Sequence, residues 1–165
     1  MEKLDRSKAR AIGVSNFQIR HLERLLSECT IVPAVNQIEL HPFWPSPELV
    51  SFCHSPEDPK RRIQCIGYAC LGAVNSPLHT HDVVTSIARE KGKMPAQVLI
   101  MWGMQKGWSV IPKSTNKERI EANFALDGWE LSEEEMKEVD GIKEREKYYG
   151  DDWLPQRVFL ESDGL

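Results

Sequence analysis

Apolar positions along the chain fall into short runs typical of buried strands and longer stretches with helical spacing. Each of four short apolar runs is followed by at least one stretch with helical periodicity. The predicted strands occupy residues 9–14, 34–38, 64–69 and 108–111, and the predicted helices occupy residues 18–29, 47–53, 82–91, 95–105, 117–125 and 132 to about 143. Because helices separate successive strands, we expect parallel strands joined by helical crossovers.

Polar side chains recur where the predicted strands end. They are Ser15 and Asn16, then Gln37, then Tyr68, then Lys113 and Ser114. A sheet edge that collects functional groups from successive strands is typical of a (β/α)8 barrel. No Gly-x-Gly-x-x-Gly follows the first strand, so the Rossmann fingerprint is absent. The expected fold is therefore α/β, with four parallel strands and their helices taken from such a barrel.

Residues 111–123 predict a strand end followed by a helix start that could bind an anion. Thr115 or Asn116 is the expected N-cap, and Glu118 completes a capping box if Thr115 is the cap. Free backbone N–H groups at a helix start favour an anion, and Lys113 and Arg119 flank this one.

The same predicted helix presents two faces. Arg119 and Asn123 share one face, where Arg119 could grip a phosphate or stack on adenine and Asn123 could hydrogen-bond a base edge. Ile120 and Phe124 are expected to form the buried face. A capped surface helix with solvated cations explains this segment about as well.

The other strand ends suit the remaining parts of a dinucleotide. The ring of Tyr68 could stack, and the turn at Leu71 and Gly72 could let backbone approach a pyrophosphate. Ser15, Asn16 and Gln37 offer the donors and acceptors that a carboxamide needs. Any one of these residues is more simply explained as a strand-end cap. Their recurrence at four strand ends favours an extended NADP(H) site.

Composition is that of a soluble globular protein. The chain has 165 residues, of which 41% are hydrophobic and 28% charged. We expect one domain over residues 1–165, with an irregular tail at 144–165. The net charge of −4 argues weakly against nucleic acid as a partner. Acidic residues dominate after Asp127, which leaves the preceding part mildly basic, as a phosphate-binding protein requires.

The ends and cysteines of the chain indicate a cytoplasmic protein without a metal. No apolar stretch is long enough for a membrane span, and the charged N-terminus lacks a signal-peptide core. Cys29, Cys53, Cys65 and Cys70 have no metal-binding spacing and are expected to be reduced thiols.

Four motifs together resemble the aldo-keto reductases. They are Gly13-Val14-Ser15-Asn16-Phe17, Asn36-Gln37-Ile38-Glu39, Tyr68-x-x-Leu71-Gly72 and Ile111-Pro112-Lys113-Ser114 with Arg119 and Asn123. They occur in family order over nearly the whole chain. The resemblance implies the C-terminal half of a (β/α)8 barrel that binds NADPH in extended form. Such enzymes transfer a hydride from nicotinamide to an aldehyde or ketone.

The resemblance also implies a role for each site residue. Ser15, Asn16 and Gln37 would bind the nicotinamide carboxamide, Tyr68 would stack under the ring, and Leu71 and Gly72 would meet the pyrophosphate. The segment around the adenosine 2′-phosphate would comprise Lys113, Ser114, Thr115, Asn116 and Arg119, and Asn123 would bind adenine.

The chain departs from the family pattern in several places. Ala69 and Cys70 stand where the family usually has Ser and Pro, and Ala122 replaces a frequent Glu, which weakens the expected affinity. The family's catalytic Asp, Tyr, Lys and His have no counterparts here, and His41 is expected to be structural. We therefore expect a cofactor-binding half that reduces carbonyls only in the full-length family.

Two alternatives stay open at this point: a non-catalytic NADP(H)-binding half-barrel, or a truncated gene product without independent activity. Strand edges that close no barrel also predict self-association.

Overall fold

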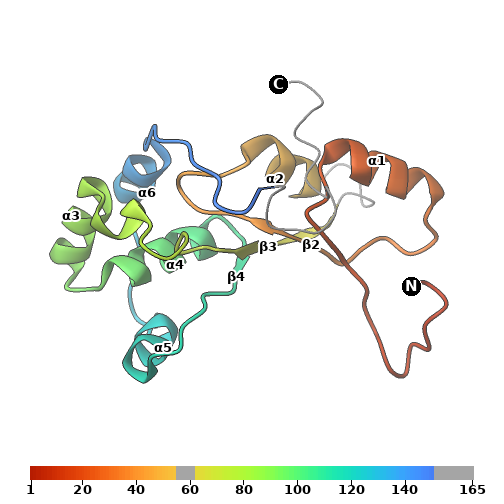
Figure 1. Cartoon of the computed structure of the whole chain (residues 1–165), viewed down its shortest axis with the longest axis horizontal. Coiled ribbons are helices and arrows are strands. Elements are labelled where there is room, and N and C mark those ends of the chain that lie inside the picture. Colours follow the sequence, from red (N-terminus) through yellow and green to blue (C-terminus); the bar gives the residue numbers. More distant parts are fainter. Residues whose placement is uncertain (55–61, 151–165) are drawn as a thin grey trace. The chain divides into compact units, whose positions relative to one another are not determined.

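A computed structural model describes residues 1–54 and 62–150 of the chain and contains four parallel strands (Figure 1). They are β1 (Val14–Ser15), β2 (Val35–Glu39), β3 (Gln64–Tyr68) and β4 (Ser109–Val110), hydrogen-bonded in the order β1-β2-β3-β4. This confirms the predicted fold class. The outer strands β1 and β4 are shorter than the predicted runs 9–14 and 108–111, and β1 overlaps its predicted run only at Val14.

The helices follow the predicted order. They are α1 (Ile19–Glu28), α2 (Pro47–His54), α3 (Asp82–Lys91), α4 (Pro95–Gln105), α5 (Lys117–Phe124) and α6 (Glu133–Asp140). A short 3-10 helix, η2 (Pro77–Thr80), was expected to be loop. It forms because the Ser76 side chain accepts a hydrogen bond from the Leu78 N–H and Pro77 fits the first helical position. The capping box at Ser132 is present at the start of α6.

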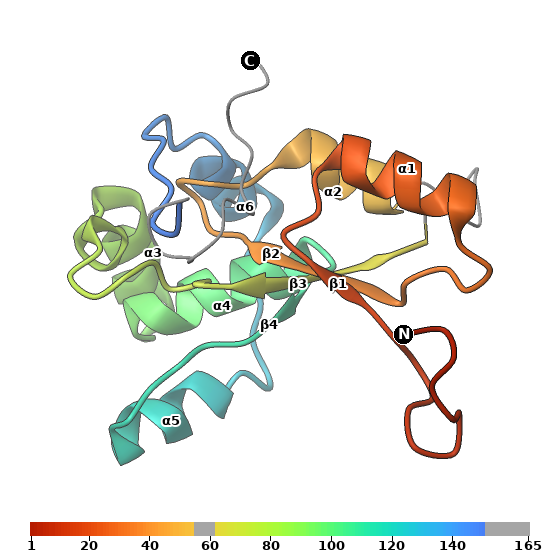
Figure 2. The same ribbon diagram turned by 45° about the vertical axis from the view of Figure 1, so that its right-hand side comes forward.

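The described part of the chain divides into two compact units. The first comprises residues 1–38, 46–54, 62–66 and 149–150. There, α1 and α2 lie on the same side of β1 and β2 in both ribbon views (Figures 1 and 2). Side chains of β2 alternate, with Asn36 and Ile38 buried and Val35 and Gln37 half-buried. One face of this strand is therefore covered more fully than the other.

The second unit comprises residues 39–45 and 67–148 and is built around α4. Every residue from Gln97 to Gly103 is buried. The indole N–H of Trp102 donates to the carboxylate of Asp140 at 2.9 Å, and its ring meets Trp108 edge to face with centroids 5.0 Å apart. These contacts tie α4 to α6 and to the residue that precedes β4.

The predicted buried face of α5 is wrong. The exposed fraction is 52% for Ile120 and 88% for Phe124, and no residue of α5 is buried. Helical spacing places the two side chains on one face, but within residues 1–54 and 62–150 nothing covers that face. One anchor lies just beyond the helix, where the Gln97 side-chain amide donates to the carbonyl of Ala125 at 2.9 Å.

The predicted irregular tail is only partly described. Residues 144–150 contain neither helix nor strand, and residues 151–165 lie outside the described part. Among the helices described, none is long and apolar enough to cross a membrane.

Candidate functional site

The predicted carboxamide-binding residues lie together in the first unit. Ser15 pairs with Gln37 in the parallel register of β1 and β2. The Ser15 hydroxyl and the Asn16 N–H both donate to the Gln37 carbonyl oxygen, each at 2.9 Å. The three residues are thus joined through one backbone oxygen. The Ser15 hydroxyl donor is used in this way, which leaves its oxygen as an acceptor for a ligand.

Asn16 occupies an unusual backbone conformation. Its φ is 59°, in the left-handed region that Asn tolerates better than most residues. The turn therefore redirects the chain between β1 and α1.

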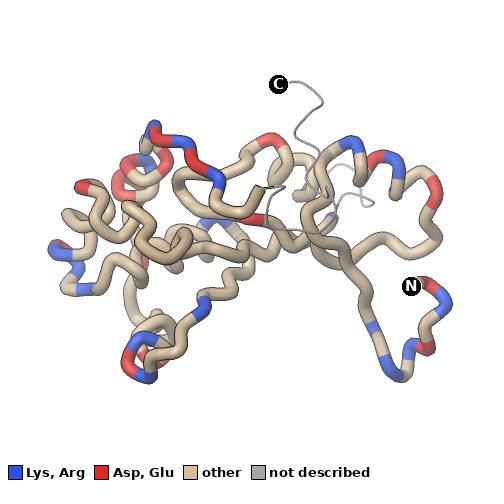
Figure 3. Tube along the Cα trace, in the orientation of Figure 1, with Lys and Arg blue, Asp and Glu red and all other residues tan. Residues whose placement is uncertain are grey.

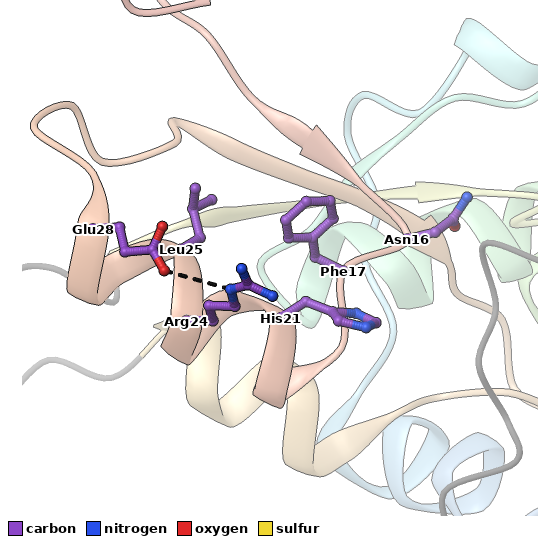
Figure 4. Close-up of a pocket in the computed structure, with 6 residues that line it drawn as sticks. All are labelled: Asn16, Phe17, His21, Arg24, Leu25 and Glu28. Atoms are coloured by element: carbon purple, nitrogen blue, oxygen red, sulfur yellow. Dashed lines mark hydrogen bonds and ion pairs between the residues drawn. The ribbon is translucent and has the colours of Figure 1, made fainter.

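A hollow of about 370 Å³ lies along α1 in the same unit (Figure 4). Its lining comprises Asn16, Phe17, His21, Arg24, Leu25 and Glu28. Figure 4 shows the apolar Phe17 and Leu25 beside the ion pair of Arg24 and Glu28, whose atoms are 3.4 Å apart. That pair is largely exposed and contributes little energy. Asn16 is the one predicted cofactor residue in the lining, so the hollow does not define the cofactor site.

In the second unit, Tyr68, Leu71 and Gly72 form the turn after β3. The Gly72 N–H donates to the Ala69 carbonyl at 2.7 Å, and both residues have positive φ, 76° and 50°. A Cβ at Gly72 would collide with the side chain of Ser76. The close approach of Ser76 is therefore enough to explain why position 72 is glycine, with no ligand needed. A role of Gly72 in pyrophosphate binding stays a prediction.

The start of α5 is capped by Asn116. Its side-chain oxygen accepts from the Arg119 backbone N–H at 2.8 Å, so Asn116 rather than Thr115 is the N-cap and the box with Glu118 does not form. The Ser114 hydroxyl oxygen in turn accepts from the Asn116 N–H at 3.2 Å. Two backbone donors that an anion could have used, the N–H groups of Asn116 and Arg119, are therefore already satisfied.

The cations near this cap are open to solvent. Lys113, Thr115 and Arg119 are exposed, and Asn123 is half-buried. Among residues 1–54 and 62–150, neither Lys113 nor the Arg119 guanidinium belongs to an ion pair. Both side chains are therefore available for an anion such as the 2′-phosphate.

Sequence reasoning missed His79 in η2, whose pKa is influenced by two residues of the predicted site. Burial lowers the pKa of His79, a hydrogen bond with the Leu71 backbone opposes that shift, and the nearby charge of Arg119 adds to it. His79 therefore lies close to both Leu71 and Arg119. The His- and Pro-rich composition of residues 76–81 was the available signal, but nothing in it specified these neighbours.

His41 belongs to a buried polar cluster in the second unit. It is fully buried, and its Nε2 lies 2.9 Å from the carboxylate of Glu39. The same carboxylate accepts from the Tyr148 backbone N–H at 2.6 Å, while the Tyr148 hydroxyl meets that of Ser76 at 2.7 Å. Full burial and the pairing with Glu39 fit the structural interpretation of His41.

The thiols show no reactive character near the turn after β3. Cys70 is buried, and burial raises its pKa to about 12, so it stays protonated at neutral pH. All four cysteines are free. Within the described residues, no group of three or more His, Cys, Asp or Glu side chains is arranged to hold a metal.

Comparison with known proteins identifies the family. The model of the aldo/keto reductase family matches residues 1–144. The chain belongs to the aldo/keto reductase family. It is 41% identical over 153 residues to the 9,11-endoperoxide prostaglandin H2 reductase of Trypanosoma cruzi, covering 92% of this chain and 52% of that protein.

Two further aldo-keto reductases show the same partial coverage. The NAD(P)H-dependent D-xylose reductase of Aspergillus niger is 39% identical over 155 residues, or 86% of this chain and 47% of its own. The solved aldose reductase of Schistosoma japonicum superposes with a TM-score of 0.80 at 34% identity, covering 92% of this chain and 48% of that one. The chain thus spans about half the length of these aldo-keto reductases.

Proposed function

We propose that this chain is the NADP(H)-binding part of an aldo-keto reductase that reduces aldehydes or ketones. The observation that carries the proposal is the family match over residues 1–144. The name of the Aspergillus niger relative, which specifies NAD(P)H dependence and a sugar substrate, supports a nicotinamide cofactor and a carbonyl substrate. We further propose a cytoplasmic location, as the composition suggested.

The proposed cofactor residues fall into two groups, one in each unit. Ser15, Asn16 and Gln37 would bind the nicotinamide carboxamide, and their clustered donors and acceptors suit that group. In the second unit Tyr68 would stack under the nicotinamide, and Leu71 and Gly72 would contact the pyrophosphate. The residues proposed for the 2′-phosphate and adenine are Lys113, Ser114, Thr115, Asn116, Arg119 and Asn123. When bound, the cofactor supplies the hydride.

The cofactor residues proposed in the second unit favour NADPH over NADH. Lys113 and Arg119 are exposed cations without ion-pair partners in the described residues, and a 2′-phosphate would give each a charge-assisted hydrogen bond. Asn116 uses its side-chain oxygen for the cap, which leaves its amide N–H groups for a phosphate oxygen.

The experiment is a titration of the whole 165-residue chain with NADPH and, separately, NADH, followed by the fluorescence of the reduced nicotinamide. We expect saturable binding of NADPH and weaker binding of NADH. Failure to bind NADPH at any concentration tested would overturn the proposal.

Turnover is a separate measurement. The chain offers no counterpart to the family's catalytic Asp, Tyr, Lys and His, so we expect no steady oxidation of NADPH in the presence of an aldehyde. Sustained turnover that the Tyr68→Phe or His41→Ala variant abolishes would reveal a catalytic group in this chain.

We also propose that the chain associates with itself or with another half-barrel. The side chains of Ile12, Val14, Val35 and Ile66 are only half-buried, and Phe124 is almost fully exposed. Apolar surface left in water favours association. Sedimentation at low micromolar concentration should show species larger than a monomer, and a compact monomer with sharp, reversible unfolding would contradict this.

A further inference from the structure

The side chain of Asn36 in β2 forms a two-bond clamp on the backbone of Phe17. Its amide nitrogen donates to the Phe17 carbonyl at 2.8 Å, and its amide oxygen accepts from the Phe17 N–H at 3.3 Å. Asn36 has no exposed surface. Burying an amide is costly unless its polar atoms have partners, and both of these hydrogen bonds go to the backbone of one residue.

The clamp acts on the residue that follows Asn16. On the other side, Asn16 is attached to β2 through its own N–H, which donates to the Gln37 carbonyl at 2.9 Å. The left-handed conformation of Asn16 is therefore held between two anchors, both supplied by consecutive residues of β2. Such a conformation is strained for a residue other than glycine and persists only where the surroundings enforce it.

The buried side chain of Asn36 also lies close to a thiol, that of Cys53 in α2. A hydrogen bond from the Cys65 side chain lowers the pKa of Cys53, burial opposes this, and a hydrogen bond with Asn36 lowers it further. Asn36 therefore has buried polar surroundings in α2 as well as its hydrogen bonds to the backbone of Phe17.

We propose that Asn36 is a positioning residue for the cofactor. It does not contact the ligand but holds residues 15–17 in the conformation that presents Ser15 and Asn16 to the nicotinamide carboxamide. This inference rests on the proposed function, because that function supplies the ligand. Without Asn36, the Phe17 N–H and carbonyl would be unpaired and the turn would be free to relax.

The test compares two ligands on the whole chain. NADPH uses both groups of cofactor residues, whereas adenosine 2′,5′-bisphosphate lacks the nicotinamide and uses only the group in the second unit. For Asn36→Ala we expect the Kd of NADPH to rise about tenfold, which corresponds to the loss of about 1.4 kcal/mol. The Kd of the bisphosphate should stay unchanged.

Gln105→Ala is the matched control. Gln105 in α4 clamps Leu131 in the same way, accepting from its N–H at 2.8 Å and donating to its carbonyl at 2.9 Å. It touches none of the proposed cofactor residues, so its loss should leave both dissociation constants unchanged. Asn36→Ser keeps a small, uncharged polar side chain that is too short to make both hydrogen bonds to Phe17. If Asn36→Ala does not fold, Asn36→Ser should still weaken NADPH selectively because this pair of hydrogen bonds is lost.

The outcomes separate this inference from the proposed function. Equal losses for NADPH and the bisphosphate, or no loss for either, would overturn the positioning role while the proposed function stands. If the wild-type chain binds neither ligand, the proposed function fails. Hydrogen exchange at the Phe17 amide then tests whether Asn36 holds this turn. A Phe17 amide that is protected in the wild type and exchanges rapidly in the variant supports it, and an unprotected Phe17 amide in the wild type overturns it.

Discussion

Two helices of the second unit, α4 and α5, show how little helical periodicity says about burial. The residues of α4 from Gln97 to Gly103 are all buried, whereas α5 buries none of its residues. Both helices were predicted from the sequence, and both form. The difference arises from their neighbours, because α4 packs against α3, α6 and Trp108, while nothing in the described part of the chain covers the face of α5 that carries Ile120 and Phe124.

The consequence is a division of roles within one unit. The core is supplied by α4, whereas α5 carries charges of both signs on its surface (Figure 3). Arg119 on α5 is among the residues proposed to bind the cofactor, and a ligand site requires this exposure. The comparison therefore predicts that substitutions in α4 alter stability and that substitutions in α5 alter binding.

The largest effect is expected for Trp102→Ala. The variant loses a fully buried indole, its edge-to-face contact with Trp108 and its hydrogen bond to Asp140. Removal of a buried Trp typically costs about 3–5 kcal/mol. Urea unfolding of the wild type and the variant would measure the difference. A loss below about 1 kcal/mol would show that α4 is not the centre of the unit.

Arg119→Ala should affect ligand choice more than folding. Each charge-assisted hydrogen bond to a phosphate contributes on the order of 1.5–3 kcal/mol, so NADPH should bind about tenfold more weakly or worse. Binding of NADH, which lacks the 2′-phosphate, should change much less. The control is Lys117→Ala, which removes another exposed cation of α5 that lies 3.9 Å from Glu121. Equal losses for the two cofactors would refute the assignment of Arg119.

We expect His79 in η2 to make the free energy of unfolding depend on pH in mild acid. Burial lowers the pKa of His79 in the folded state, so the unfolded chain, with a pKa near 6.5, takes up the proton more readily. The free energy of unfolding should therefore fall as the pH drops below about 6.5, until His79 protonates in the folded state as well.

Urea titrations at successive pH values between neutrality and mild acid would measure this fall. His79→Gln should reduce the slope of the free energy of unfolding against pH without abolishing it, because burial also lowers the pKa of His21 and of His54. An unchanged slope in the variant would contradict the role given to His79.

The smallest effect is expected for Phe124→Ala. The side chain is 88% exposed, so its removal takes little apolar surface out of a packed environment. The free energy of unfolding should change by less than about 0.5 kcal/mol. A loss comparable with that of Trp102→Ala would mean that another element or another molecule covers α5 in solution.

Local signals in the sequence determined most of the elements. The bounds of α3 and α4 agree with those predicted because Gly92, with φ of 63°, ends one helix and Pro95 opens the other. The Ser-x-x-Glu spacing of Ser132 and Glu135, which forms a capping box in the structure, likewise marks the start of α6. Such signals act between residues a few positions apart and are therefore visible in the sequence. The assignment of the cofactor residues rests on a family resemblance and stays a prediction.

Tertiary structure decided what these signals could not. Whether Phe124 is exposed depends on which other elements pack against its helix, and not on the sequence of the helix itself. Position 72 requires glycine because the side chain of Ser76 lies too close for a Cβ. The clamp of Asn36 on Phe17 joins residues 19 positions apart, and the charge of Arg119 in α5 lowers the pKa of His79 in η2. Burial and long-range hydrogen bonds depend on which segments meet in space, and that information is distributed over the whole chain rather than contained in any one segment.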